Sequence, residues 1–413
     1  MEYGCIGEHL PHSFSKEIHE LIESYDYRLR ELRPEELQDF MTAKDFRAIN
    51  VTIPYKQDVM PYLSEISEKA REIGAVNTIV NRDGKLCGYN TDYMGMDALL
   101  QKLQIEPSGK KALILGTGGT SKTALSLLRD RGASEVLRVS RTEKPGAVTY
   151  EEVYEKHRDA ALIINTTPVG MFPKTDGCPL KLSAFPKLSG VVDAVYNPLR
   201  TNLVQDALSL GIPAEGGLYM LVAQAVFAAE HFTGRSYDRD ILPRIFRKIR
   251  SDKENIVITG MSGAGKSAVG QALRRITGRT LYDTDTLITE KAGMTIPEIF
   301  ARFGEDYFRD LESAVIREIA AVNGAVISTG GGAVLREENI RELKKNGRIF
   351  FLRRDISEIR PSENRPLANT EEKVAALYLA RLPIYERTSD CDVKVSGTPE
   401  DTAQILLKTR LQA

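Results

Sequence analysis

Short apolar runs that end at glycine or polar residues alternate along the chain with stretches in which apolar residues recur at helical spacing. The strongest strand candidates cover residues 111–115, 135–140, 161–167, 190–196, 255–259 and 325–329, and shorter ones cover 48–53 and 77–80. Strands that alternate with helices favour a parallel sheet covered on both faces. The pattern therefore predicts an α/β protein built from three α/β lobes.

The boundary between domains is predicted at residues 246–254, a charged stretch that follows the apolar run 218–232. A new strand begins directly after it, and Pro243 lies just before it, so we expect a linker there rather than the polar face of one long helix. Chain length then divides residues 1–245 into a lobe over 1–100 and a lobe over 101–225, with the last helices returning to the first lobe. Residues 255–413 form the third lobe.

Composition excludes several classes of protein. Hydrophobic residues make up 42% and charged residues 27% of the 413 residues, which is ordinary globular usage and not that of a fibrous or disordered chain. A net charge of -1 provides no basic field for nucleic acid or an anionic membrane. No signal peptide or membrane-spanning run is recognisable, and four separated cysteines fit a reducing compartment. We expect a cytoplasmic protein whose partners are small molecules, and the sequence leaves its oligomeric state open.

A glycine-rich loop at residues 260–267 follows the strand 255–259 and precedes a helix, and it fits the pattern GxxxxGK[ST]. Glycines such as Gly263 and Gly265 let backbone N–H groups turn inward around phosphate oxygens, assisted by the N-terminus of the helix. Lys266 would reach the β- and γ-phosphates, and the Ser267 hydroxyl would ligate Mg²⁺. The loop therefore predicts a site for ATP and magnesium.

Downstream charged residues provide candidates for the phosphoryl acceptor site. Asp283 and Asp285 lie two apart, so in an extended segment they project from one face, where one holds Mg²⁺ and the other orients or deprotonates a hydroxyl. The alternative is a solvated turn. Arg309 and Glu312 lie one helical turn apart, either as an oriented guanidinium or as a surface ion pair. The triplet 330–332 allows close approach of a ligand or backbone.

The C-terminal third carries two further cations. Arg365 lies in a polar segment typical of a mobile lid, and Arg381 lies in RLPIYE, which we interpret as the end of a helix. With GMSGAGKS, DTD, FRDLE, STGGG and RPL in the same order, residues 255–413 resemble shikimate kinase, whose fold is a P-loop domain with a parallel sheet.

That resemblance implies a role for each matched residue. Asp283 would assist Mg²⁺ and Asp285 would meet the substrate hydroxyl. Arg309 and Arg381 would hold the shikimate carboxylate, with Glu312 orienting Arg309. The remaining matched residues are Gly331 and Gly332, which would pack against the substrate ring, and Arg365, which would approach the transferred phosphate. Two arginines aimed at one small acid distinguish this pattern from other small-molecule kinases, because guanidinium groups pair bidentately with carboxylates.

A second glycine loop, with Gly116, Gly118 and Gly119, follows the strand 111–115 and precedes a helix, as in a Rossmann-type dinucleotide site. In NAD-binding sites, an acidic residue just after the second strand binds the ribose 2′-hydroxyl, and this chain has no acidic residue directly after the strand 135–140. The chain instead has Ser140, Arg141 and Thr142, which suit the 2′-phosphate of NADP. Alternatively, the arginine is a surface residue at a strand end. The composition of this segment favours NADP over NAD.

Polar side chains are scattered through the first lobe at positions that a core would not require. They are Ser13, Ser15, Thr52, Lys56, Asn77 and Asp92. Singly, each is an ordinary cap, turn former or surface residue. As a set, they supply donors and acceptors for a polyhydroxylated ring, and a lysine–aspartate pair for proton transfer. The clustered histidines receive no catalytic role.

Residues 1–245 resemble shikimate dehydrogenase through nine ordered segments: HSFS, NVTIPYK, GAVNT, YNTD, GTGGTSKTA, SRT, NTTPVGM, DAVYNP and GGLYMLVAQA. The resemblance implies that Lys56 and Asp92 are the catalytic pair. It also implies substrate contacts from residues of both lobes, namely Ser13, Ser15 and Thr52 at the carboxylate, Asn77, Asp92 and Gln224 at the hydroxyls, and Tyr196 nearby.

Together the two resemblances predict a bifunctional enzyme that reduces 3-dehydroshikimate with NADPH and then phosphorylates the resulting shikimate with MgATP. One alternative is that one half is degenerate and serves as a ligand-binding module. The intact chemical residues argue against it, namely Lys56, Asp92, Lys266, Ser267, Asp283 and Asp285. A second alternative is an NAD-dependent quinate or shikimate dehydrogenase fused to the kinase.

Overall fold

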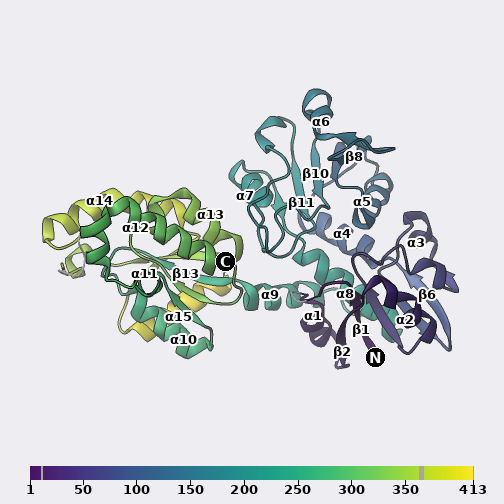
Figure 1. The fold of residues 1–413 in the computed structure, drawn as a ribbon, viewed down its shortest axis with the longest axis horizontal. Helices are drawn as coiled ribbons and strands as arrows, with labels where there is room; N and C mark the ends of the chain where they lie inside the picture. The colour runs from purple at the N-terminus through teal and green to yellow at the C-terminus, as the bar shows by residue number, and fades with distance from the viewer. Residues whose placement is uncertain (11–12, 362–366, 413) are drawn as a thin grey trace. The chain divides into compact units, whose positions relative to one another are not determined.

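The computed structural model describes residues 1–10, 13–361 and 367–412, and the chain folds into two units, Met1–Arg250 and Ser251–Ala413 (Figure 1). The segment 246–254, expected to be a linker, is helical almost throughout, because α9 runs over Ile241–Lys253. Pro243 does not prevent this helix, because it lies in the first turn. Backbone N–H groups there make no intrahelical hydrogen bond, so the lack of an N–H on proline costs the helix nothing. The boundary between the two units, after Arg250, falls within the predicted segment, but the expectation that the segment is a linker outside a helix is wrong, because the boundary lies within α9.

The first lobe of the N-terminal unit contains a mixed six-stranded sheet in the order β2-β1-β3-β5-β6-β4. Its strands are β1 (Tyr3–Gly7), β2 (Tyr27–Glu31), β3 (Ala48–Val51), β4 (Glu65–Ile66), β5 (Thr78–Arg82) and β6 (Lys85–Tyr89). Its helices are α1 (Ser15–Ile22), η1 (Pro34–Glu36), α2 (Leu37–Ala43), η2 (Met60–Tyr62) and α3 (Glu68–Ile73). Antiparallel pairing joins β3 to β5 and β5 to β6, and in the β5–β6 hairpin Asp83 and Gly84 have the positive φ angles that a two-residue turn requires.

The second lobe contains a parallel sheet in the order β12-β11-β10-β7-β8-β9. Its strands are β7 (Lys111–Leu115), β8 (Glu135–Ser140), β9 (Val148–Thr149), β10 (Leu162–Asn165), β11 (Gly190–Asp193) and β12 (Ala214–Glu215). Its helices are α5 (Gly119–Asp130), α6 (Tyr150–Lys156), η3 (Leu182–Ala184) and α7 (Asn202–Ser209). This order reverses direction between β7 and β10, and in open α/β sheets a ligand binds at the carboxyl ends of the strands at that point.

Two helices join these lobes, α4 (Thr91–Lys102) and α8 (Leu218–Thr233), and Figure 1 shows both between the two sheets. Apolar residues occupy most of the surface of α8, which is the pattern of a helix buried on all sides. It packs against α1, α4 and α9, with Ile18, Val222 and Ile245 in a shared core. Because α8 continues from 218 to 233, the expected lobe boundary at residue 225 lies in the middle of a helix.

A buried histidine lies in the core of the first lobe. His19 of α1 is fully buried and stacks on Tyr27 at 4.0 Å between ring centroids, and its Nδ1 lies 2.6 Å from the Tyr25 hydroxyl. Burial lowers the pKa of His19 to about 3, so the imidazole stays neutral in the folded state. The unfolded chain protonates it near its ordinary pKa, about 6.5.

We therefore expect His19→Phe to flatten the acid side of the stability profile. Between about pH 6.5 and 3 the unfolded state binds the extra proton, so the free energy of unfolding of the wild type falls as the pH falls, by roughly 1 kcal/mol per pH unit from this group. The variant keeps a stacking ring but lacks this slope. Pulse proteolysis in urea at pH 7, 6 and 5 measures the free energy of unfolding of the N-terminal unit, and parallel profiles for the two proteins would contradict the assignment.

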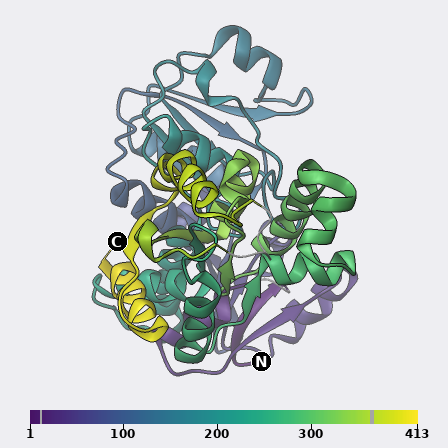
Figure 2. The same ribbon diagram turned by 90° about the vertical axis from the view of Figure 1, so that its left-hand side faces the viewer.

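The C-terminal unit contains a parallel sheet in the order β14-β15-β13-β16-β17. Its strands are β13 (Asn255–Thr259), β14 (Leu281–Asp283), β15 (Val326–Ser328), β16 (Gly347–Arg353) and β17 (Cys391–Lys394). Its helices are α10 (Lys266–Thr277), α11 (Thr284–Ala292), α12 (Ile296–Ala320), η4 (Ala333–Leu335), α13 (Glu337–Asn346), η5 (Ile356–Glu358), α14 (Glu371–Thr388) and α15 (Pro399–Gln412). Helices α10 and α15 pack together on one face of the sheet, and α12 and α13 pack together on the other (Figures 1 and 2). In the described part of the chain, we find no helix with the length and apolar character needed to cross a membrane.

Candidate active sites

The N-terminal unit contains a cavity of about 1370 Å³ at the junction of its two lobes. Every substrate or dinucleotide residue predicted in this unit lines it: Ser13, Ser15, Thr52, Lys56, Asn77, Asp92, Gly116, Gly118, Gly119, Ser140, Arg141, Thr142, Tyr196 and Gln224. The fold therefore brings residues from distant parts of the sequence to one continuous space.

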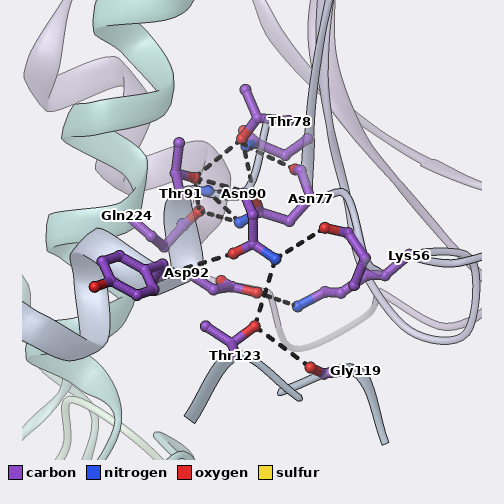
Figure 3. Close-up of polar contacts among 12 residues, drawn as sticks. Lys56, Asn77, Thr78, Asn90, Thr91, Asp92, Gly119, Thr123 and Gln224 are labelled. Atoms are coloured by element: carbon purple, nitrogen blue, oxygen red, sulfur yellow. Dashed lines mark hydrogen bonds and ion pairs between the residues drawn. The ribbon is translucent and has the colours of Figure 1, made fainter. Parts of the chain in front are cut away.

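Lys56 and Asp92 form a buried ion pair in this cavity, with 2.5 Å between Nζ and Oδ2 (Figure 3). Only 14% and 9% of their side chains are exposed. Asp92 is the second residue of α4, where the positive end of the helix dipole favours a carboxylate. Asn90 caps this helix by accepting a hydrogen bond from the Tyr93 N–H at 3.2 Å. The ion pair with Asp92 thus holds the Lys56 ammonium group in a fixed position inside the cavity.

An amide and hydroxyl network lies beside this pair. The Asn77 side-chain oxygen accepts from the Thr91 N–H at 2.7 Å, which satisfies a free N–H at the start of α4. Its Nδ2 donates to Thr91 Oγ1 at 3.1 Å and to Gln224 Oε1 at 3.4 Å, while the Thr78 hydroxyl donates to its oxygen at 3.1 Å (Figure 3). These bonds hold Asn77, one residue before β5, and Gln224 from α8 side by side.

The glycine loop between β7 and α5 is built for close approach. Gly116 has φ +113°, and a Cβ there would lie 2.8 Å from Thr166 Oγ1. Apart from Gly118 itself and its two chain neighbours, no atom of the described residues lies within 4 Å of the Cβ position of Gly118, which caps α5, so the space beside this cap is open. Ser121, at the third glycine position of the motif, is buried and donates to the Gly116 carbonyl at 2.8 Å. The loop fits a dinucleotide pyrophosphate.

The carboxyl end of β8 supplies the residues expected at the ribose phosphate. Ser140 ends the strand, and the exposed Arg141 and Thr142 follow it at the cavity wall. Lys144 lines the same wall and donates to Thr117 Oγ1 at 3.4 Å, so a second cation lies in this part of the cavity. Sequence reasoning missed Lys144, although its position three residues after the arginine was a usable signal.

A buried carboxyl group, that of Asp193, holds the loops after β10 and β11, and sequence reasoning did not predict it. Asp193 is fully buried and accepts from Asn165 Nδ2 at 2.9 Å, from the Val195 N–H at 3.0 Å and from the Thr201 hydroxyl at 2.6 Å. Burial raises the pKa of this carboxyl to about 7. Asn165 in turn accepts from the Thr167 hydroxyl at 2.7 Å. The segments NTTPVGM and DAVYNP thus fix cavity-lining residues through one buried carboxyl group.

The phosphate loop of the C-terminal unit has the predicted conformation. Gly260, Gly263 and Gly265 have φ angles of +145°, +91° and +94°, which favour glycine. Lys266 is buried at the start of α10 and donates from Nζ to the carbonyls of Gly260 and Met261, both at 2.9 Å. The loop is a preformed cradle for phosphate with a cation inside it.

Asp283 contacts Ser267, as expected for two residues that share a metal ion, but it does not lie in an extended segment with Asp285. The Ser267 hydroxyl donates to Asp283 Oδ2 at 2.7 Å, which joins the two residues expected to hold the metal. Asp283 ends β14 and caps α11, accepting from the Asp285 N–H at 3.2 Å, and Asp285 lies in the first turn of that helix. The expectation of two carboxylates on one extended face is wrong because this cap begins a helix between them. Asp285 instead faces Gly330, whose Cβ would lie 2.7 Å from Oδ1.

Arg309 and Glu312 of α12 form a buried pair, with 2.7 Å between Nη1 and Oε2, rather than a surface pair. Burial raises the pKa of Glu312, against the opposing effect of Arg309. The glycine triplet makes room for these groups: a Cβ at Gly330 would lie 2.7 Å from Glu312 Oε1, and a Cβ at Gly332 would collide with the Arg309 guanidinium. At Gly331 it would lie 2.9 Å from the Ser262 nitrogen of the phosphate loop. The three glycines therefore allow side chains and backbone of the protein itself to approach closely, which is one of the two possibilities that the sequence pattern predicted.

Arg381 lies in the interior of α14 and not at its end. The helix continues through Pro383 to Thr388, so the expected helix end is wrong, because tertiary packing overrides the proline. Arg381 is buried and donates to the Gly331 carbonyl at 3.1 Å, and the Tyr385 hydroxyl donates to the same oxygen. Arg381 also lies close enough to Glu312 to lower the pKa of that carboxyl, against the larger effect of its burial. Arg365 falls outside the described residues.

The two sites define the class of protein: an NADP-dependent oxidoreductase and an ATP-dependent kinase on one chain. The model of the shikimate dehydrogenase substrate binding domain matches residues 5–79, and the shikimate kinase model matches residues 262–410. Over 245 residues the chain is 39% identical to the shikimate dehydrogenase (NADP(+)) of Clostridium beijerinckii, covering 55% of this chain and 90% of that protein. The chain belongs to the shikimate dehydrogenase family and carries a shikimate kinase domain at residues 262–410.

Solved structures agree with this assignment over the N-terminal unit. Shikimate dehydrogenase 1 from Peptoclostridium difficile is 36% identical with a TM-score of 0.56, covering 60% of this chain and 98% of that one. The shikimate 5-dehydrogenase from Thermus thermophilus, solved in complex with NADP(H) and shikimate, is 30% identical with a TM-score of 0.55, covering 60% and 99%. The chain is thus a bifunctional enzyme of the shikimate pathway that uses NADP and ATP.

Proposed function

We propose that residues 1–245 reduce 3-dehydroshikimate to shikimate with NADPH, and that residues 255–413 phosphorylate the 3-hydroxyl of shikimate with MgATP. The observation that carries the proposal is the buried Lys56–Asp92 pair, which lies in the same cavity as the dinucleotide loop. The product of the first reaction is the substrate of the second, which gives a functional reason for one chain to contain both sites.

In the reduction, the chain's own residues orient the substrate and move a proton. NADPH, when bound along the loop containing Gly116, Gly118 and Gly119, supplies the hydride. As negative charge develops on the carbonyl oxygen, the Lys56 ammonium donates a proton to it, and Asp92 holds that ammonium in position. The remaining contacts are proposed as Ser13, Ser15 and Thr52 at the carboxylate, Asn77 and Gln224 at the hydroxyls, and Tyr196 at the cavity wall.

In the phosphorylation, the chain orients an acceptor hydroxyl and neutralises charge. MgATP, when bound on the phosphate loop, supplies the phosphoryl group, with Ser267 and Asp283 as the magnesium residues and Lys266 at the phosphates. Asp285 would accept the proton of the hydroxyl. The proposed substrate contacts are Arg309 and Arg381 at the carboxylate, Glu312 behind Arg309, and Gly331 and Gly332 at the ring, while Arg365 is proposed at the transferred phosphate.

A coupled assay tests the proposal directly. Purified chain receives 3-dehydroshikimate, NADPH and MgATP, and the consumption of both nucleotides is followed together with the phosphorylated product. We expect oxidation of NADPH to precede formation of ADP, and ADP to appear only when the first reaction has supplied shikimate. Consumption of neither nucleotide would contradict the proposal, and consumption of one would exclude the activity that is missing.

Selectivity for NADPH should depend on Arg141. We expect Arg141→Gln to raise KM for NADPH by about 10- to 100-fold, which corresponds to the loss of a charge-assisted contact of about 1.5–3 kcal/mol. KM for NADH should change little, because NADH lacks the 2′-phosphate. Arg158→Gln, a surface variant in the same lobe whose arginine binds the Ala184 carbonyl, serves as the control. Equal losses with the two cofactors would contradict the assignment.

A further inference from the structure

Arg309 binds a second carboxylate that neither the sequence motifs nor the proposed mechanism uses. Glu305 lies four residues before it on α12, and its Oε1 accepts from Arg309 Nε at 3.2 Å and from Nη2 at 2.9 Å. Glu312 accepts from Nη1 at 2.7 Å. Nε and Nη2 together form one of the two edges through which a guanidinium binds a carboxylate bidentately. Glu305 therefore occupies an edge of Arg309 that a bound acid can use.

The two glutamates differ in their access to solvent. The Glu312 side chain is fully buried, whereas 43% of the Glu305 side chain is exposed. Gly304 directly precedes Glu305 with φ +83° and ψ 178°, which interrupts the helical backbone of α12 at this point. Apart from Gly304 itself, its two chain neighbours and the nearby backbone of its own helix, no atom of the described residues lies within 4 Å of its Cβ position, so this side of the helix is open. Glu305 can reach water by a local rotation, and Glu312 cannot.

Charge balance favours an exchange of carboxylates. In the part of the chain that the structure describes, the guanidinium groups gathered here are those of Arg309 and Arg381, with a combined charge of +2, and the carboxylates are those of Glu305, Glu312 and Asp285, with a combined charge of -3. Adding a substrate carboxylate to this set would bring the sum from -1 to -2 in a largely buried site, where unpaired charge is costly. Replacing Glu305 by the substrate carboxylate leaves the sum at -1 and returns Glu305 to water.

We propose that Glu305 is a built-in stand-in for the carboxylate of the substrate. It holds the Nε and Nη2 edge of Arg309 when the pocket is empty, and it turns outward at Gly304 when a small cyclic acid binds. Glu305 is thus a specificity-determining residue, because a neutral ring cannot replace its charge on Arg309. The inference rests on the proposed kinase function and adds to it how the substrate carboxylate replaces Glu305 on Arg309.

The Glu305→Gln variant tests this proposal, because the proposal predicts whether its affinity for shikimate rises or falls. The amide keeps the shape of the side chain but competes weakly for Arg309, so we expect KM for shikimate in phosphorylation to fall about 5- to 10-fold, because more of the free enzyme is competent to bind the acid. KM for MgATP and kcat should stay within about twofold. Calorimetric titration of shikimate should show the same gain in affinity without turnover.

Glu312→Gln is the matched control, since its carboxylate is buried and has no route to water; its KM for shikimate should rise. Glu305→Ala provides a second variant, which must change affinity in the same direction as Glu305→Gln. An unchanged or higher KM in both Glu305 variants would overturn the inference and make Glu305 a fixed support of Arg309. If the wild-type chain phosphorylates no shikimate at all, the proposed function fails instead, so the two failures are distinguishable.

Discussion

Replacing Lys56 with Gln should lower the rate of 3-dehydroshikimate reduction by about 10²- to 10⁴-fold, the usual range for loss of a positioned general acid. The ammonium of Lys56 is held 2.5 Å from Asp92, and the side chain is largely buried, so bulk water cannot readily replace it as a proton donor. Gln can still donate a hydrogen bond to Asp92, which limits the cost of leaving that carboxylate unpaired. The measurement is kcat for NADPH oxidation.

The same variant should phosphorylate shikimate at the wild-type rate, because Lys56 belongs to the other unit. Lys44→Gln is the matched control: Lys44 is a partly exposed lysine of the same lobe whose Nζ donates to the Gly84 carbonyl, and its loss should leave both rates unchanged. A Lys56→Gln protein that reduces dehydroshikimate at the normal rate would end the proposed role of Lys56 as proton donor.

Replacing Lys266 with Ala should lower phosphorylation of shikimate by about 10²- to 10³-fold, the range for loss of a preorganised group that stabilises charge in the transition state. Lys266 is buried at the start of α10, and its Nζ lies 2.9 Å from two carbonyls of the phosphate loop. No water or solvent ion matches a cation fixed inside that loop. The measurement is kcat for ADP formation at saturating shikimate and MgATP.

Reduction of dehydroshikimate by the Lys266→Ala protein should remain near wild type. Lys291→Ala removes a surface lysine of the same unit that pairs with Glu318, and it should change neither activity. Loss of both activities in Lys266→Ala would contradict independent sites. Together, the two lysine variants assign one reaction to each unit.

Features that depend on local pattern could be predicted from the sequence. Strands such as 111–115 and 255–259 are continuous apolar runs that end at a glycine loop, and both appear in the structure as β7 and β13. The glycines at 263 and 265 have the positive φ angles that the phosphate-loop motif requires. For the residues of the first unit, ordered motifs predicted a common site, and the structure places them around one cavity.

Features that depend on tertiary packing could not be predicted. The charged segment 246–254 is helical because the apolar residues of α9 from Ile241 to Ile249 pack into the core of the N-terminal unit. Asp283 caps a helix, and this moves Asp285 into a different local conformation. The buried links from Asp193, and the contact of Glu305 with Arg309, join groups whose pairing no spacing rule specifies.

If each unit has its own pocket for shikimate, one chain binds two molecules of this small cyclic acid. Equilibrium binding of radiolabelled shikimate, measured on the intact chain with saturating NADP⁺ and MgADP, counts them. We expect two shikimate molecules per chain, with one lost when the N-terminal pocket is changed by Asp92→Ala and the other lost when the C-terminal pocket is changed by Arg381→Ala. Binding of a single molecule per chain, or of none, would show that two such pockets do not exist.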